Sequence, residues 1–110
     1  MNLLDLKSKL EKGKELQGDV VYIKEDNLIS GIDSVYKNQE DKSVVLLKSK
    51  EETIKVDHLL KILNEIYALV GDVEVFTCDG ELSRGISKKI QSVEFAQYEL
   101  VKMLFINVSY

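Results

Sequence analysis

The chain contains a single cysteine, Cys78, and a single histidine, His58, two residue types that often carry nucleophilic chemistry. A thiolate nucleophile needs a base within hydrogen-bond reach, or a site that lowers its pKa. These two residues are therefore the one pair from which a small thiol-dependent hydrolase could be built. The competing interpretation is that Cys78 packs as a small apolar side chain in a strand, while His58 lies exposed at a helix start.

The single arginine, Arg84, lies in the stretch FTCDGELSRGI at residues 76–86, near Asp79, Lys88 and Lys89. Arginine forms bidentate contacts with carboxylate or phosphate that lysine cannot reproduce. We therefore expect these four residues to form a loop that binds an anion or a partner protein. A solvated loop charge, paired with an acidic neighbour, is the alternative.

Motifs for other common chemistries are absent from the sequence. It has no glycine-rich phosphate loop, no HExxH, no CxxC and no Gly-x-Ser-x-Gly. One histidine and one cysteine cannot supply a zinc site by themselves, and no EF-hand spacing appears. Acidic pairs such as Glu51-Glu52 fall in predicted turns, where solvated charge is the ordinary interpretation. We expect no cofactor, no metal and no catalytic residue.

The composition fits one soluble globular domain spanning residues 1–110. The chain is 45% hydrophobic and 31% charged, which allows an ordinary apolar core. A net charge of -4 argues against direct nucleic-acid binding. The sequence lacks an apolar run of the ~20 residues that a membrane span needs, and its start lacks the features of a signal peptide. Because a lone cysteine excludes an internal disulfide, we expect a cytoplasmic location.

Two helices are predicted from apolar spacing. Leu3, Leu6 and Leu10 form one stripe of a helix that Gly13 is expected to end. The second helix follows Asp57, a good N-cap residue, and Gly71 is expected to end it. Its apolar positions are numerous enough to predict burial over much of the circumference, and they are Leu59, Leu60, Ile62, Leu63, Ile66, Tyr67, Leu69 and Val70.

Strands are predicted where β-branched and aromatic residues cluster, at residues 19–26, 28–37, 43–49, 72–78, 90–95 and 100–110. Asp26-Asn27 is expected to form the first hairpin turn, and residues 96–99 the last. The nearly unbroken apolar run of 100–110 predicts a strand covered on both faces. This strand is expected either inside the sheet or paired across a homodimer.

Both halves of the chain, 1–50 and 51–110, read helix, strand, strand, strand. Residues 18–32 can be laid on 71–86 with one insertion, matching Gly18-Asp19-Val20 with Gly71-Asp72-Val73. Gly31-Ile32 then matches Gly85-Ile86, and Ser34-Val35 matches Ser92-Val93 after a further insertion. We predict an α+β fold of two tandem αβββ halves, with antiparallel sheet and two helices, that arose by internal duplication. Chance similarity between two strand–turn–strand segments is the alternative.

The segment VDHLLKILNEIYALVGDVEVFTCDGELSRGI resembles a pattern found in small phage and prophage proteins: an apolar helix, a Gly/Asp turn and a short antiparallel sheet that opens with V-E-V. The resemblance covers about residues 53–109. Phage proteins of this size are often binders that modify or inhibit host machinery, including antiviral defence. The resemblance therefore implies a binding protein in the host cytoplasm, and it carries over no catalytic residue.

The expected function is that of a non-enzymatic binding protein, which acts on a host protein or sequesters a small anionic ligand through the Arg84 loop. Two alternatives remain open at this point. One is a thiol-dependent enzyme that uses Cys78 and His58. The other is a structural or assembly subunit that acts through the apolar C-terminal strand.

Overall fold

The computed structural model describes residues 1–38, 42–78 and 87–108, and within them the chain forms two helices and seven strands. This is the α+β class that the sequence predicts. The elements are α1 (Leu3–Glu15), β1 (Val20–Glu25), β2 (Leu28–Asn38), β3 (Ser43–Ser49), β4 (Ile54–Lys55), α2 (Val56–Val70), β5 (Val75–Cys78), β6 (Lys88–Tyr98) and β7 (Val101–Val108).

The described strands form one sheet in the order β2-β3-β5-β6-β7-β1-β4, and β1 also pairs with β2, so that six strands make a ring. The sheet is mixed rather than wholly antiparallel, because β3 pairs with β5 and β7 pairs with β1 in parallel. Parallel neighbours need a crossover connection. The helix α2 supplies one between β3 and β5.

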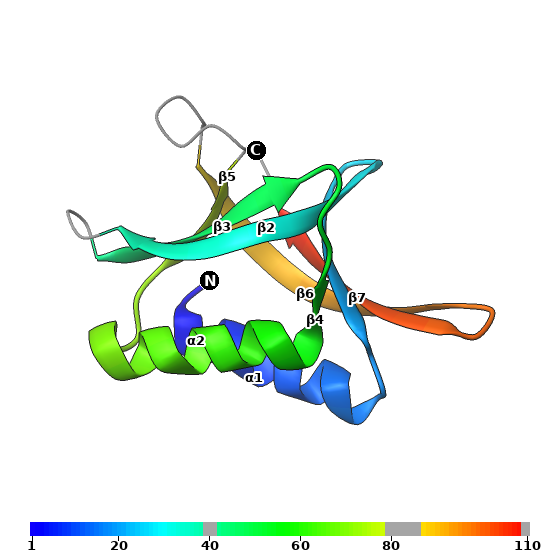
Figure 1. Cartoon of the computed structure of the whole chain (residues 1–110), viewed down its shortest axis with the longest axis horizontal. Helices are drawn as coiled ribbons and strands as arrows, with labels where there is room; N and C mark the ends of the chain where they lie inside the picture. The colour runs from blue at the N-terminus through cyan, green and yellow to red at the C-terminus, as the bar shows by residue number, and fades with distance from the viewer. Residues whose placement is uncertain (39–41, 79–86, 109–110) are drawn as a thin grey trace.

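The ring closes at one end and opens at the other. Residues 28–30 of β2 pair with β1, whereas residues 31–38 pair with β3. In the same way, Lys88 and Lys89 of β6 pair with β5, whereas residues 90–98 pair with β7. The strands therefore separate away from the two hairpin ends, and α1 and α2 lie side by side across the opening (Figure 1).

One apolar core fills the space between the helices and the ring. Both helices contribute fully buried leucines, Leu3, Leu6 and Leu10 from α1 and Leu59 and Leu63 from α2. These meet inward side chains of the strands, which include Val21, Ile23, Val44, Leu46, Val75, Leu104 and Ile106. The predicted stripe of α1 is confirmed. The prediction that α2 is buried around much of its circumference is wrong for the last turns of the helix, where Leu69 is 70% exposed.

The ends of the helices differ in part from expectation. Gly13 does not end α1, which continues to Glu15. A side chain at Gly13 would place its Cβ 2.4 Å from Cδ2 of Leu104, so this glycine allows the helix to lie close against β7. Gly71 does end α2, with the positive φ of 78° that glycine tolerates best.

Asp57 is not the N-cap of α2. The helix begins one residue earlier, at Val56, whose N–H donates to the Asp19 carbonyl at 2.8 Å. The Asp57 carboxylate lies 2.7 Å from Nζ of Lys14, and this hydrogen bond is the main reason that the pKa of Lys14 is raised. Asp57 therefore joins the two helices rather than capping its own.

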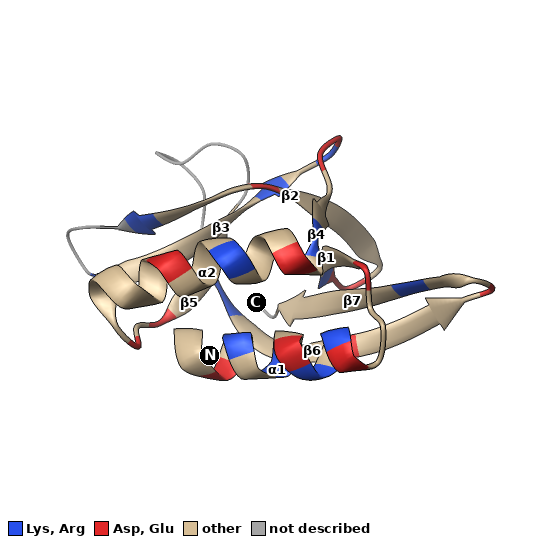
Figure 2. Ribbon diagram, turned by 60° about the horizontal axis from the view of Figure 1, so that its bottom comes forward, with Lys and Arg blue, Asp and Glu red and all other residues tan. Residues whose placement is uncertain are grey.

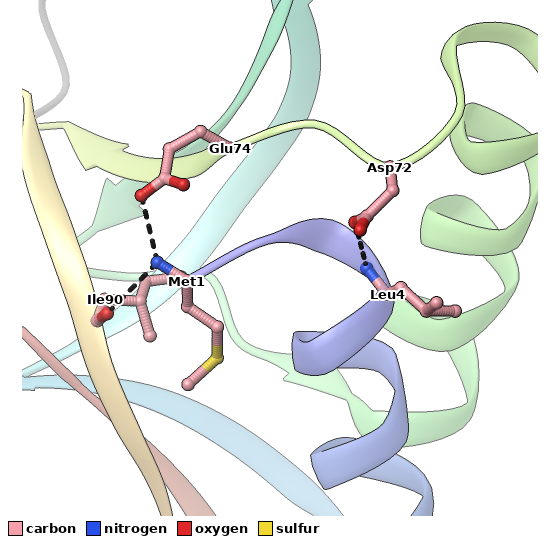
Figure 3. Close-up of polar contacts among 5 residues, drawn as sticks. All are labelled: Met1, Leu4, Asp72, Glu74 and Ile90. Carbon is pink, nitrogen blue, oxygen red and sulfur yellow. Dashed lines mark hydrogen bonds and ion pairs between the residues drawn. The ribbon is translucent and has the colours of Figure 1, made fainter.

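Each helix begins against the segment that leads into the first strand after the other helix. Val56 of α2 bonds to Asp19, and Leu3 of α1 donates its N–H to the Val73 carbonyl at 2.8 Å. Figure 3 shows a further contact at the start of α1, where the Asp72 carboxylate accepts the Leu4 N–H at 2.9 Å. Since Asn2 makes no side-chain cap, α1 takes its capping acceptor from the other half of the chain.

The N-terminal amino group lies beside this cap (Figure 3). The amino group is 3.0 Å from Oε1 of Glu74 and 3.5 Å from the Ile90 carbonyl oxygen. The Met1 side chain is 4% exposed. A bridge between Asn2 and Glu74 adds backbone pairing at the same place. The start of the chain therefore holds β5 and β6 as well as α1.

The order αβββ occurs twice, with the short strand β4 between the two copies, but the structure changes the match between them. In β1 the inward residue Val21 pairs with Leu104, and in β5 the inward residue Val75 pairs with Val44. The predicted alignment of the two copies places these inward positions one residue apart instead of matching them. The bulges of β2 and β6 fall at Asp33 and Gln91. Each bulge lies within the pattern Ile-x-Ser-Val, at 32–35 and 90–93, which supports the predicted match of Ser34-Val35 with Ser92-Val93. Descent by internal duplication stays a prediction, and Gly85-Ile86 lies outside the described residues.

The cap of α1 by Asp72 can be tested through stability. We expect Asp72→Ala to lower the free energy of unfolding by about 0.5–2 kcal/mol, because the Leu4 N–H loses its acceptor. Asp72→Asn keeps an acceptor oxygen and should retain most of the stability. Urea unfolding followed by circular dichroism gives both values. Equal stability of the alanine variant and the native chain would contradict the cap.

Candidate functional site

Three charged side chains point into the ring at its closed end. Glu25 ends β1 on the same face as the buried Val21 and Ile23. Lys48 lies near the end of β3, two positions beyond the buried Leu46, and Lys88 begins β6. Since alternate residues of a strand share a face, all three positions continue the inward rows of their strands. The apolar core therefore changes to a charged layer at this end.

Glu25 is an ion-pair partner of both lysines. Its Oε2 contacts Nζ of Lys48 and its Oε1 contacts Nζ of Lys88. The three side chains are only 10%, 11% and 17% exposed, in the order Glu25, Lys48, Lys88. By contrast, the Lys14–Asp57 pair is more than half exposed, and Figure 2 shows charges of both signs along α1 and α2. Among the described residues, Glu25 is the most buried charged side chain.

A buried hydroxyl lies next to this cluster. Thr77 of β5 is fully buried, and its Oγ1 has no hydrogen-bond partner among the described residues. Thr77 is the cross-strand neighbour of Lys88, so the two side chains lie on the same face of the ladder. A buried hydroxyl without a partner is costly, and such a group marks a place where a polar atom can be accepted.

The cluster opens into a groove of about 910 Å³. This is within the size range of small-molecule sites. The groove is lined by Glu25, Leu28, Ser30, Asp33, Lys48, Ser49, Lys50, Glu51, Glu52 and Lys88. Its inner part contains the three buried charges, and its outer part is formed by the connection from β3 to β4.

That connection is held in place by two local features. The Ser49 hydroxyl accepts the N–H groups of Glu51 at 3.1 Å and Glu52 at 2.9 Å, which folds the segment into a turn. Gly31 of β2 lies directly beneath it, because a Cβ at this position would be 1.7 Å from the Glu52 carbonyl oxygen. The groove therefore has a fixed wall, and only glycine permits the close approach.

Of the four predicted binding residues, the structure describes Lys88 and Lys89. Lys88 and Lys89 begin β6 rather than lying in a loop, and they point to opposite faces. Lys88 belongs to the buried cluster, whereas Lys89 is exposed. Arg84 and Asp79 lie outside the described residues. Glu25 and Lys48 were missed by sequence reasoning, although a signal existed, since each occupies an inward position in an alternating strand.

Cys78 and His58 belong to different parts of the fold. Cys78 is 3% exposed and packs with Val45 and Leu47 in a small cluster separate from the main core. It ends β5, the end of the strand farther from the helices, whereas His58 is exposed in the first turn of α2. This burial favours the packing interpretation of the cysteine. The thiol-dependent enzyme stays an untested alternative.

Within residues 1–38, 42–78 and 87–108, no group of three or more histidine, cysteine, aspartate or glutamate residues is placed to hold a metal ion. Among the described helices, neither has the length and apolar character needed to cross a membrane.

Comparisons with known proteins give no match to this chain, whether with family models, curated proteins or solved structures.

The importance of the buried carboxylate can be measured directly. Glu25→Gln leaves two largely buried lysines without their shared counter-ion, and breaking such a pair costs about 3–5 kcal/mol. The matched control is Glu94→Gln, because Glu94 is half exposed and lies 3.8 Å from Lys24. Its loss should cost less than about 1 kcal/mol. Chemical unfolding of the two variants compares them, and a small, equal effect would show that the Glu25 cluster contributes no more than a surface pair.

Proposed function

We propose that this protein is a non-enzymatic binding protein that holds a small anionic ligand in the groove at the closed end of the ring. The observation that carries the proposal is the placement of Lys48 and Lys88, two largely buried ammonium groups at the inner end of a groove of ligand size. Charged donors in a site shielded from water bind anions more strongly than surface lysines do. The proposal assigns no catalytic residue.

The phage or prophage type of the protein belongs to the same proposal. It rests on the resemblance of residues 53–109 to small phage proteins, and it places the ligand in the cytoplasm of a host cell. Sequestering a small ligand requires a pocket and a fixed wall, both of which the groove has. It does not require a nucleophile, and the burial of Cys78 is consistent with that.

A host protein is the second candidate partner, and a separate surface favours it. The β6–β7 hairpin projects from the body of the molecule (Figure 1), and its tip carries Tyr98, Leu100 and Val101 at 62%, 96% and 54% exposure. Exposed apolar side chains gathered in this way are typical of protein contacts. Assembly through the body of β7 is not favoured, because this strand lies between β6 and β1 and pairs with both.

The ligand proposal is tested with a variant that removes the charges and keeps the fold. We expect the triple variant Glu25→Leu, Lys48→Met, Lys88→Met to fold, since replacing a whole buried ion cluster by apolar residues is often neutral or stabilising. Native and triple-variant proteins are incubated with a deproteinised host-cell extract, washed and analysed by mass spectrometry. We expect the native protein to retain an anion, and the variant to bind it at least roughly tenfold more weakly.

Retention of the same anion by both proteins would contradict the proposal, as would the absence of any retained anion. The control for the hairpin surface is Leu100→Asp, which leaves the groove residues unchanged. This variant should retain the anion fully. Loss of a captured host protein in Leu100→Asp alone would favour the second candidate.

A further inference from the structure

The net charge of the groove changes sign with depth. Lys48, Lys88 and Glu25 lie at its inner end, where their side chains are less than a fifth exposed and their formal charges sum to +1. The carboxylates of Asp33, Glu51 and Glu52 belong to exposed residues at its outer part. Lys50 is the one exposed cation among the lining residues. A ligand that enters the groove therefore meets a net negative outer part and a net positive inner part.

This arrangement is poorly suited to a ligand that carries only negative charge. The lining contains three lysines and four carboxylates, which gives a formal net charge of -1. Attraction by the inner lysines is then opposed by repulsion at the entrance, since like charges at short range disfavour each other. A ligand that also carries a cationic group turns the outer repulsion into a second attraction.

The distance between the two regions limits the size of such a ligand. Glu51 follows Lys48 by three residues, so their Cα atoms are at most roughly 11 Å apart. The turn held by Ser49 shortens this span, because the segment folds back on itself. The contact of the Glu52 carbonyl with Gly31 keeps the outer carboxylates over the groove. Lys48 and the outer Glu51 and Glu52 therefore lie on one short folded segment, which suits a compact ligand better than a long one.

We infer that the ligand is a compact amine-bearing anion, with its anionic group at Lys48 and Lys88 and its amine at Glu51 and Glu52. This inference rests on the proposed function and names the class of ligand for the same groove. Amino phosphates and amino acids are members of this class, whereas inorganic phosphate and simple amines each carry half of the required groups.

The test uses three related probes: O-phosphoethanolamine, which carries both charges, and its two halves, inorganic phosphate and ethanolamine. Titration of the isotope-labelled native protein is followed by amide chemical shifts, which also locate the site. We expect O-phosphoethanolamine to bind at least roughly tenfold more tightly than either half. The shifts should be largest around Lys48, Lys88 and the turn at 49–52.

A pair of variants separates the two ends of the groove. Glu51→Gln with Glu52→Gln keeps the backbone N–H groups that Ser49 accepts, so the wall should stay folded. This variant should bind O-phosphoethanolamine at least roughly tenfold more weakly and inorganic phosphate no more weakly than the native chain does. The matched control, Glu94→Gln with Glu99→Gln, removes two carboxylates elsewhere and should change neither value.

The outcomes distinguish this inference from the function on which it rests. Equal binding of phosphate and O-phosphoethanolamine would overturn the amine requirement and leave an anion site. Binding that is unaffected by Glu51→Gln with Glu52→Gln would overturn it as well. If none of the three probes binds, the inference fails, and the extract experiment decides separately whether the groove holds an anion of another class.

Discussion

The double pairing of β2 and β6 is the constraint on which the rest of this structure depends. Each of these long strands leaves its hairpin partner after a few residues and continues along a different neighbour. The change of partner comes just before the bulges at Asp33 and Gln91, and an extra residue bends a strand and increases its twist. The ring can therefore close at one end and open at the other. The opening is what admits the two helices and their leucines into the core.

The closed end has the opposite consequence. No helix covers it in the described part of the chain, and its inward rows end in Glu25, Lys48 and Lys88 rather than in apolar residues. Burial of these charges is offset by their mutual ion pairs, because a lone charge in such a place would be strongly unfavourable. Gly31 and the Ser49 turn then bring the β3–β4 connection over the cluster. Scaffold and candidate site thus arise from the same feature of the sheet.

The proposed binding function rests on this division of the molecule into two ends. At the helix end, reciprocal contacts such as Leu3 with Val73 and Val56 with Asp19 join the halves into one body. The groove end is shaped by backbone features and carries segregated charge. In the proposed function, a ligand is recognised by the placement of its charges against a net positive inner end and a net negative outer part.

The sequence by itself determined the class of fold and most of its elements. Alternation in 20–25 and the leucine spacing of 3–10 report local periodicity, which a single strand or helix expresses without help from the rest of the chain. Gly71 ends its helix for the same local reason. The predicted helix end at Gly13 and the predicted N-cap at Asp57 were wrong. The roles of these two residues are set by Leu104 and Lys14, which are far away in sequence. The meeting of Glu25, Lys48 and Lys88 was decided only by the tertiary structure. Three strands from both halves converge there, and periodicity can say that a charge faces inward but not which charge it will meet.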